Sequence, residues 1–129
     1  MIVGVGVDIV EVERIRRALE DGKIGQRFRD RVYTKGEIEY CEDKRKGKYQ
    51  SYAGRFAAKE AVMKALGSGW GSRVTWQEIE VLPALGGRPE VSLKDKTAAY
   101  ARDLGMQNFL ISISHSERFA VAYVVAQTP

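Results

Sequence analysis

The sequence predicts an α+β fold in which a mostly antiparallel sheet packs against one long central helix. Residues 56–66 are rich in helix-forming side chains and contain neither proline nor glycine, and aromatic residues at helical spacing extend this helix back to about residue 48. Residues 109–116 alternate apolar and polar side chains, and a second strand, 119–126, follows after two residues. Strands joined by short turns pair antiparallel, and their separation from a run of helices indicates the α+β class.

The other elements follow from local patterns. Residues 2–10 form a strand of Val and Ile whose glycines suggest close backbone contact. Thr34 and Glu37 have capping-box spacing, which opens a helix to about residue 44. We further expect helices at 11–19, 26–32 and 95–104, strands at 74–82 and 88–93, and a turn at 83–87. No linker or repeat interrupts the chain, so residues 1–129 are predicted to be one domain.

The composition excludes several classes of protein. No apolar run approaches the roughly 20 residues that span a membrane, and we expect no signal peptide because the first residues lack a basic segment. A single cysteine, Cys41, cannot form an intrachain disulfide, which suits a cytoplasmic location. Nothing near Cys41 in the sequence favours a thiolate, so we interpret it as structural.

The charge is positive and uneven. The formal net charge is +4, and basic residues gather in residues 14–31 and 44–48. The simplest interpretation is a solvated basic face. The alternatives are a surface that binds nucleic acid, a phosphorylated small molecule or an acidic protein.

Two features of the central helix exceed what a core helix needs. Alanines at positions 53, 57, 61 and 65 form a row that lets another element approach closely. Glu60 and Lys64 lie one turn apart beside this row. Their spacing alone predicts a surface ion pair. The alternative is a carboxylate that holds a hard cation next to an amine that holds a phosphate.

Two polar residues lie in apolar strands. Asp8 lies among Val and Ile residues, where a charge is costly unless it is paired or metal-bound, although an Asp near a strand end also caps turns. His115, the only histidine, lies among three serines at a strand end. It is either a hydrogen-bonded structural residue or part of a phosphate-binding cluster.

Three segments resemble the holo-[acyl-carrier-protein] synthases, a family of 4′-phosphopantetheinyl transferases. Residues 4–15, GVGVDIVEVERI, resemble the N-terminal motif of this family. Residues 55–67, RFAAKEAVMKALG, resemble its central motif, and residues 112–116, SISHS, its C-terminal motif. The order and spacing of the motifs agree over essentially the whole chain.

The resemblance implies the 4′-phosphopantetheinyl transferase fold and a defined reaction. The family transfers the 4′-phosphopantetheine arm of coenzyme A to a serine of apo acyl carrier protein and releases adenosine 3′,5′-bisphosphate. Asp8 and Glu60 match its Mg²⁺ ligands, and Lys64 matches a lysine near the pyrophosphate, so these three are the implied catalytic residues. The serine proton would pass to a metal-bound water or to a carboxylate such as Asp8.

The resemblance also implies contacts with coenzyme A and with the carrier. Coenzyme A would meet Arg55, His115 and Lys46 around its 3′-phosphate, Pro89 at the adenine, and the backbone amides of Gly67, Ser68 and Gly69. Ser116 is a further implied contact with coenzyme A. The acidic carrier would meet Arg14, Arg17, Arg27 and the apolar Phe28. Short members of the family are homotrimers, which would place Asp8, Glu60 and Lys64 of one subunit opposite His115 of the next.

One departure and two alternative functions accompany this interpretation. The chain has Ser68 where the family commonly has Thr, which keeps the hydroxyl. A nucleic-acid-binding module would need a row of stacking aromatic residues among the basic ones, and the sequence lacks one. A noncatalytic coenzyme A-binding protein would not need Asp8, Glu60 and Lys64 together. We therefore expect neither a nucleic acid nor a membrane as partner.

Overall fold

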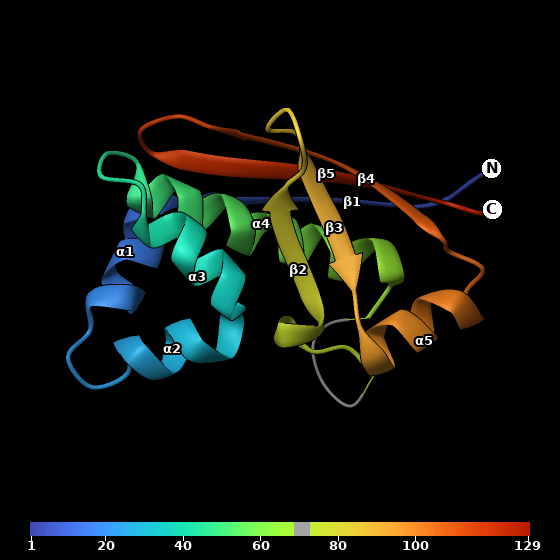
Figure 1. Ribbon diagram of the computed structural model, residues 1–129, viewed down its shortest axis with the longest axis horizontal. Coiled ribbons are helices and arrows are strands. Elements are labelled where there is room, and N and C mark those ends of the chain that lie inside the picture. Colours follow the sequence, from blue (N-terminus) through green and yellow to red (C-terminus); the bar gives the residue numbers. More distant parts are fainter. Residues whose placement is uncertain (69–72) are drawn as a thin grey trace.

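The computed structural model describes residues 1–68 and 73–129, so the predicted site residue Gly69 lies outside the described residues. Figure 1 shows the arrangement of the elements. In chain order they are β1 (Ile2–Glu11), α1 (Val12–Glu20), α2 (Gly25–Val32), α3 (Lys35–Glu42), α4 (Lys48–Leu66), the 3₁₀ helix η1 (Trp76–Glu78), β2 (Ile79–Pro83), β3 (Pro89–Leu93), α5 (Asp95–Asp103), β4 (Asn108–His115) and β5 (Phe119–Gln127).

The strands are all antiparallel, as predicted, but they form two sheets. One sheet has the strand order β1-β5-β4, and β2 pairs with β3 in a separate hairpin. In Figure 1 the three long strands run side by side along the top, and the β2–β3 hairpin crosses in front of α4. Because β5 is central, β1 and β4 are the two edges of the larger sheet.

Helix α4 packs across the three-stranded sheet through small residues. A Cβ on Gly6 would lie 2.0 Å from the carbonyl oxygen of Ala61, and one on Gly4 would lie 2.7 Å from that of Ala65. Nearer its start, α4 meets the opposite edge of the sheet, since a Cβ on Gly54 would lie 3.1 Å from Ile113 of β4. The alanine row and the strand glycines thus allow the predicted close approach of α4 to the sheet. Along its length, α4 runs from the β4 edge of the sheet to the β1 edge.

The start of α3 is capped as predicted. The hydroxyl oxygen of Thr34 accepts a hydrogen bond from the backbone N–H of Glu37, and the Glu37 carboxylate accepts one from the backbone N–H of Thr34. The strand predicted at residues 74–82 is wrong at its start, because residues 76–78 form η1 and the strand begins only at Ile79.

A charged pair that sequence analysis did not identify lies in the core. The Lys59 ammonium is 2.6 Å from Oε1 of Glu37, and both side chains are 0% exposed. Lys59 also donates hydrogen bonds to the carbonyl oxygens of Val32 and Trp76, at 2.7 and 3.0 Å. The other carboxylate oxygen of Glu37 accepts a hydrogen bond from the backbone N–H of Val81 at 2.7 Å. Through these bonds Lys59 of α4 contacts α2, α3 and η1, and Glu37 in turn contacts β2.

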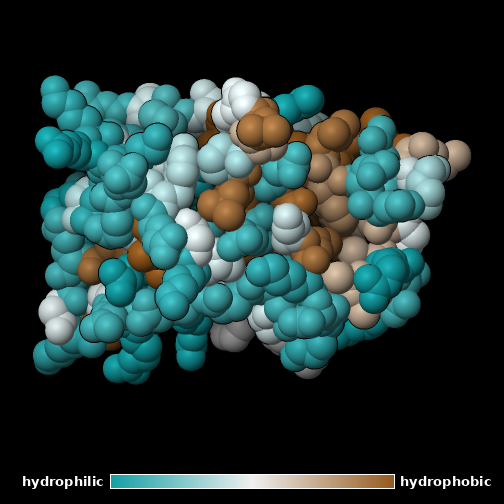
Figure 2. All heavy atoms as spheres, in the orientation of Figure 1, coloured by the Kyte–Doolittle hydropathy of each residue, from teal (hydrophilic) through white to brown (hydrophobic). Residues whose placement is uncertain are grey.

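The surface divides into a polar helical end and a more apolar sheet end. Figure 2 shows mainly hydrophilic residues over α1, α2 and α3, and hydrophobic residues gathered over the strands toward the upper right. Large apolar side chains are exposed on the strands of the three-stranded sheet, among them Val5, Val7, Ile9, Leu110, Phe119 and Tyr123. Within the described ranges, no helix has both the length and the apolarity that a membrane crossing requires.

Candidate active site

Asp8 and Lys64 meet where α4 crosses the edge strand β1. The Lys64 ammonium lies 3.1 Å from Oδ1 of Asp8 and donates a second hydrogen bond, at 2.9 Å, to the carbonyl oxygen of Val7. The Asp8 side chain is 17% exposed and that of Lys64 is 53% exposed. Lys64 thus pairs with a strand carboxylate, whereas helical spacing alone predicts a pair with Glu60. Asp8 does not cap α1, because no side chain caps the start of that helix.

Glu60 lies within the same charged group. Burial raises the pKa of the Glu60 carboxyl, and the neighbouring charge of Asp8 raises it further. The positive charges of Lys64 and Arg14 lower the pKa of Glu60. Two carboxylates therefore lie close enough to repel each other, with two cations beside them.

This arrangement fits a hard divalent cation. Carboxylate oxygens are ligands that Mg²⁺ prefers, and a cation between Asp8 and Glu60 would relieve their repulsion. In the described part of the chain, no group of three or more His, Cys, Asp or Glu side chains is placed to hold a metal. The remaining ligands would therefore come from substrate oxygens and water, which Mg²⁺ commonly retains.

A cavity adjoins Lys64. It has a volume of about 290 Å³ and is lined by Lys64, Val5, Gly6, Val7 and Tyr123. A ligand in this cavity would meet the Lys64 ammonium on one side and apolar side chains of β1 and β5 on the other.

A second group of predicted residues lies toward the opposite edge of the sheet. His115 is exposed at the end of the edge strand β4, and Pro89 begins β3, which lies beside β4. Arg55 lies next to Gly54, the residue of α4 that contacts β4. It is only 7% exposed, its guanidinium lies 4.3 Å from the ring centre of Tyr40, and its Nε has no hydrogen-bond partner among the described residues. His115 and Pro89 thus lie on the β4 side of the sheet, whereas Asp8 lies on β1, with β5 between the two edge strands.

The backbone of Gly67 and Ser68 is engaged within α4. Gly67 has a φ of 75° and its N–H bonds to the carbonyl oxygens of Lys64 and Met63, while the Ser68 N–H bonds to that of Met63. The N–H groups of Gly67 and Ser68 are therefore used by the helix C-cap, and the closeness of this backbone to coenzyme A stays a prediction. Ser116 organises the β4–β5 turn, where its hydroxyl oxygen accepts hydrogen bonds from the N–H groups of Arg118 and Phe119. Lys46 is exposed between α3 and α4.

The predicted carrier contacts lie on α1 and α2. Arg14, Arg17 and Arg27 are exposed, and Phe28 is half-buried, with its ring stacked on Phe56 at a centroid distance of 6.3 Å. A shallow cavity of about 220 Å³ is lined by Arg27, Phe28 and two residues that sequence analysis missed, Ile24 and Arg31. Ile24 is an exposed apolar side chain directly before α2. An apolar residue within this arginine-rich part of the sequence could have marked it as a contact residue.

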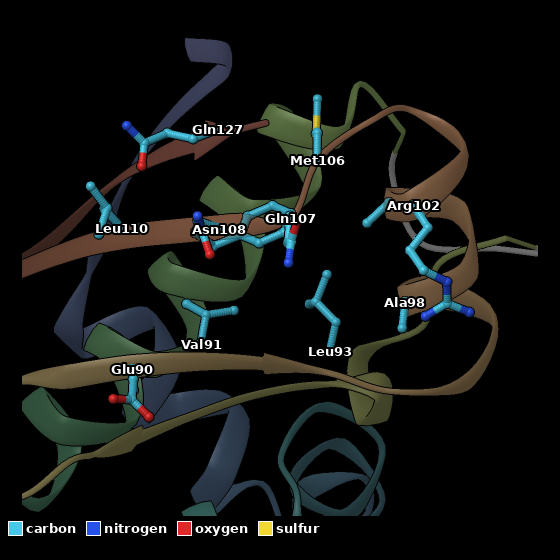
Figure 3. Close-up of a pocket in the computed structure, with 12 residues that line it drawn as sticks. Glu90, Val91, Leu93, Ala98, Arg102, Met106, Gln107, Asn108, Leu110 and Gln127 are labelled. Carbon is cyan, nitrogen blue, oxygen red and sulfur yellow. The ribbon is translucent and has the colours of Figure 1, made fainter. Parts of the chain in front are cut away.

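A larger cavity begins next to Pro89, at the following residue of β3, Glu90. It has a volume of about 540 Å³ and opens between β3, α5 and β4. Figure 3 shows Val91 and Leu93 of β3 facing Asn108 and Leu110 of β4 across it, with Arg102 of α5 at one end. None of the predicted site residues lines this cavity, so its size does not identify the site.

Comparison with known proteins identifies the family of this chain. The family model of the 4′-phosphopantetheinyl transferase superfamily matches residues 4–124. A holo-[acyl-carrier-protein] synthase of Ruminiclostridium cellulolyticum is 50% identical over 120 residues, which cover 93% of this chain and 88% of that protein.

Solved structures of similar chains have the same fold. The crystal structure of holo-[acyl-carrier-protein] synthase from Neisseria meningitidis has a TM-score of 0.89 at 34% identity and covers 99% of this chain and 100% of that one. A holo-(acyl-carrier-protein) synthase from Bacillus anthracis, solved in complex with CoA (3′,5′-ADP), has a TM-score of 0.81 at 36% identity, with coverage of 100% and 99%.

Proposed function

The chain belongs to the 4′-phosphopantetheinyl transferase superfamily, and we propose that it is a holo-[acyl-carrier-protein] synthase. In this reaction the oxygen of a carrier serine bonds to the phosphorus that bears the pantetheine arm of coenzyme A. The bond from that phosphorus to the leaving adenosine 3′,5′-bisphosphate breaks, and the serine loses its proton. The products are holo acyl carrier protein and the bisphosphate.

The observation that carries the proposal is the meeting of Asp8, Glu60 and Lys64 at the crossing of β1 and α4. Asp8 and Glu60 are 52 residues apart in the chain, and a purely structural role would not require two neighbouring carboxylates at an exposed edge. Asp8 and Glu60 would hold Mg²⁺, which when bound would neutralise charge that develops on the pyrophosphate oxygens.

Lys64 supplies the mobile positive charge of this site. More than half of its side chain is exposed, and its ammonium forms an ion pair with Asp8. The four-carbon chain that carries the ammonium is flexible. In the loaded site the same ammonium would turn toward the pyrophosphate, where it stabilises negative charge on the leaving group.

The basic end of the molecule would receive the carrier. Arg14 lies close enough to Glu60 to lower its pKa, and Phe28 stacks on Phe56, one helical turn before Glu60. A carrier docked on α1 and α2 would therefore present its serine next to Glu60. Opposite charges on the two proteins would speed their association.

The test is intact-mass spectrometry of apo acyl carrier protein incubated with coenzyme A and this protein, with Mg²⁺ or with EDTA. We expect the mass of one phosphopantetheine arm to be added only with Mg²⁺. Glu60→Gln should lower the rate by about 100-fold or more, because even outer partners of a metal ligand are worth about 10–100-fold. Glu39→Gln, at an exposed position of α3, is the matched control and should keep the rate. Full transfer by folded Glu60→Gln would overturn the assignment.

We also propose that the active unit is a homotrimer with each site between two subunits. Two observations support it: the Asp8 and His115 groups lie at opposite edges of the sheet, and apolar side chains are exposed on the strands between them. Mixing and refolding Glu60→Gln with His115→Ala tests this. If each site is shared between two chains, some sites in a mixed oligomer combine the unsubstituted Glu60 of one chain with the unsubstituted His115 of the other. The activity of the mixture should then exceed that of either variant alone. No recovery would mean that each site is built from one chain. The cytoplasmic location stays a prediction.

A further inference from the structure

Arg55 is a buried cation that lacks an acidic partner in the described part of the chain. It is 7% exposed, its Nε makes no hydrogen bond there, and none of the ion pairs found there includes it. A buried charge is unfavourable unless a group of opposite charge offsets it. Under the proposed function, that group is the 3′-phosphate of coenzyme A.

The Tyr40 ring holds Arg55 and a second cation. The Arg55 Cζ lies 4.3 Å from the ring centroid, and the Lys44 Nζ lies 4.6 Å from it. Tyr40 belongs to α3, Arg55 to α4, and Lys44 to the segment between these helices. The π-system of the Tyr40 ring attracts both cations, although the two positive charges repel each other. An anion bound next to both cations would be attracted to each of them and would offset their mutual repulsion.

We propose that Tyr40 is a positioning residue, which holds Arg55 and Lys44 together to bind the 3′-phosphate of coenzyme A. The inference rests on the proposed function and deepens it. Tyr40 itself touches neither the pyrophosphate nor the carrier serine. It acts through the two cations, so removing its ring should weaken recognition of one phosphate group and leave the rest of the substrate unaffected.

The test compares coenzyme A with 3′-dephospho-coenzyme A, which lacks only that phosphate. Tyr40→Leu should raise the KM for coenzyme A about tenfold, because the ring face no longer orders the cations. The KM for the dephospho substrate should change less than twofold, and kcat should stay close to that of the wild type. Tyr40→Phe keeps the ring face and is the matched control, with both KM values near those of the wild type.

A merely structural Tyr40 gives a different result. Loss of packing between α3 and α4 would raise both KM values together, and this outcome overturns the proposal. Lys44→Gln is a second variant, since Lys44 is exposed and its replacement leaves the core intact. It too should weaken binding of coenzyme A and spare the dephospho substrate.

Calorimetric binding separates this inference from the proposed function. Adenosine 3′,5′-bisphosphate and adenosine 5′-monophosphate differ in the 3′-phosphate, and their binding requires no turnover. Tyr40→Leu should lower affinity for the bisphosphate alone. If the wild type binds the bisphosphate selectively but transfers nothing, the proposed function fails while the role of Tyr40 is still measured. If Tyr40→Leu binds the bisphosphate as tightly as the wild type, Tyr40 has no such role.

Discussion

Replacing Lys59 by Met should strongly destabilise the protein. Lys59 has no exposed surface, and its ammonium bonds to the Glu37 carboxylate and to two carbonyl oxygens. Without it, Glu37 keeps two backbone N–H donors, from Thr34 and Val81, but loses the positive charge of Lys59. Breaking a buried pair from one side costs about 3–5 kcal/mol, because the remaining charge is left buried. We expect the free energy of unfolding to fall by about that amount.

The dependence of this loss on pH follows from the carboxyl group. Burial raises the pKa of Glu37 in the folded protein, and the nearby Lys59 charge lowers it again. Lys59→Met removes the lowering by the Lys59 charge, and only the weaker lowering by the backbone N–H groups of Thr34 and Val81 still opposes the effect of burial. The folded state therefore holds the Glu37 proton more tightly than the unfolded chain does. The penalty is then complete above the raised pKa of the folded state. It shrinks as the pH falls toward about 4.5, the ordinary value for Glu.

Urea unfolding monitored by fluorescence and circular dichroism measures the loss at pH 7 and pH 5. Lys96→Met, an exposed lysine of α5, is the matched control and should change stability by less than about 0.5 kcal/mol. The double variant Lys59→Met/Glu37→Gln should be less destabilised than the sum of its single changes. A loss below about 1 kcal/mol for Lys59→Met, or strict additivity in the double variant, would refute the reasoning.

Three further predictions follow from the packing and the titrating groups. Gly6→Ala should lower stability by about 1–3 kcal/mol, because its Cβ would lie 2.0 Å from the Ala61 carbonyl oxygen; thermal unfolding checks this. Burial raises the pKa of the Cys41 thiol to about 11, so alkylation by iodoacetamide at pH 8 should be at least about 100-fold slower than for a free cysteine, and equal rates would contradict it. The Tyr52 hydroxyl lowers the pKa of Glu42, so Tyr52→Phe should be less stable than the wild type above about pH 5, and the difference should shrink as the pH falls and Glu42 is protonated; urea titrations at pH 7 and pH 3 measure it.

Local chemistry explains which elements were predictable. The capping box at Thr34 and the glycine end of α4 each depend on a few neighbouring residues, and both are confirmed. The strand predicted from residue 74 is wrong because the apolar alternation of Val74 and Trp76 does not continue in phase to Ile79 and Val81. That break in the period marks η1. The partners of the strands depend on tertiary packing, so the separation into two sheets had no local signal.

Long-range partners were the least predictable part of the candidate site. Lys64 has Glu60 one turn away in sequence, yet its ammonium bonds to Asp8 on β1. Lys59 lies among buried residues of α4, which could have marked it as a buried cation, but nothing local names Glu37 as its partner. Tyr40 was missed for the same reason, because its role depends on Arg55, 15 residues further along the chain.

The pairing of Asp8 with Glu60 is a consequence of backbone packing. Gly6 lies two residues before Asp8 and its neighbour on α4, Ala61, directly follows Glu60. Residues two apart on a strand share a face, so Asp8 points toward α4 as Gly6 does. A larger side chain at position 6 or 61 would separate the two backbones and carry the carboxylates apart with them. The glycines and the alanine row therefore belong to the site as much as to the core, whereas the pairing of these two carboxylates was implied in the sequence only by the family resemblance.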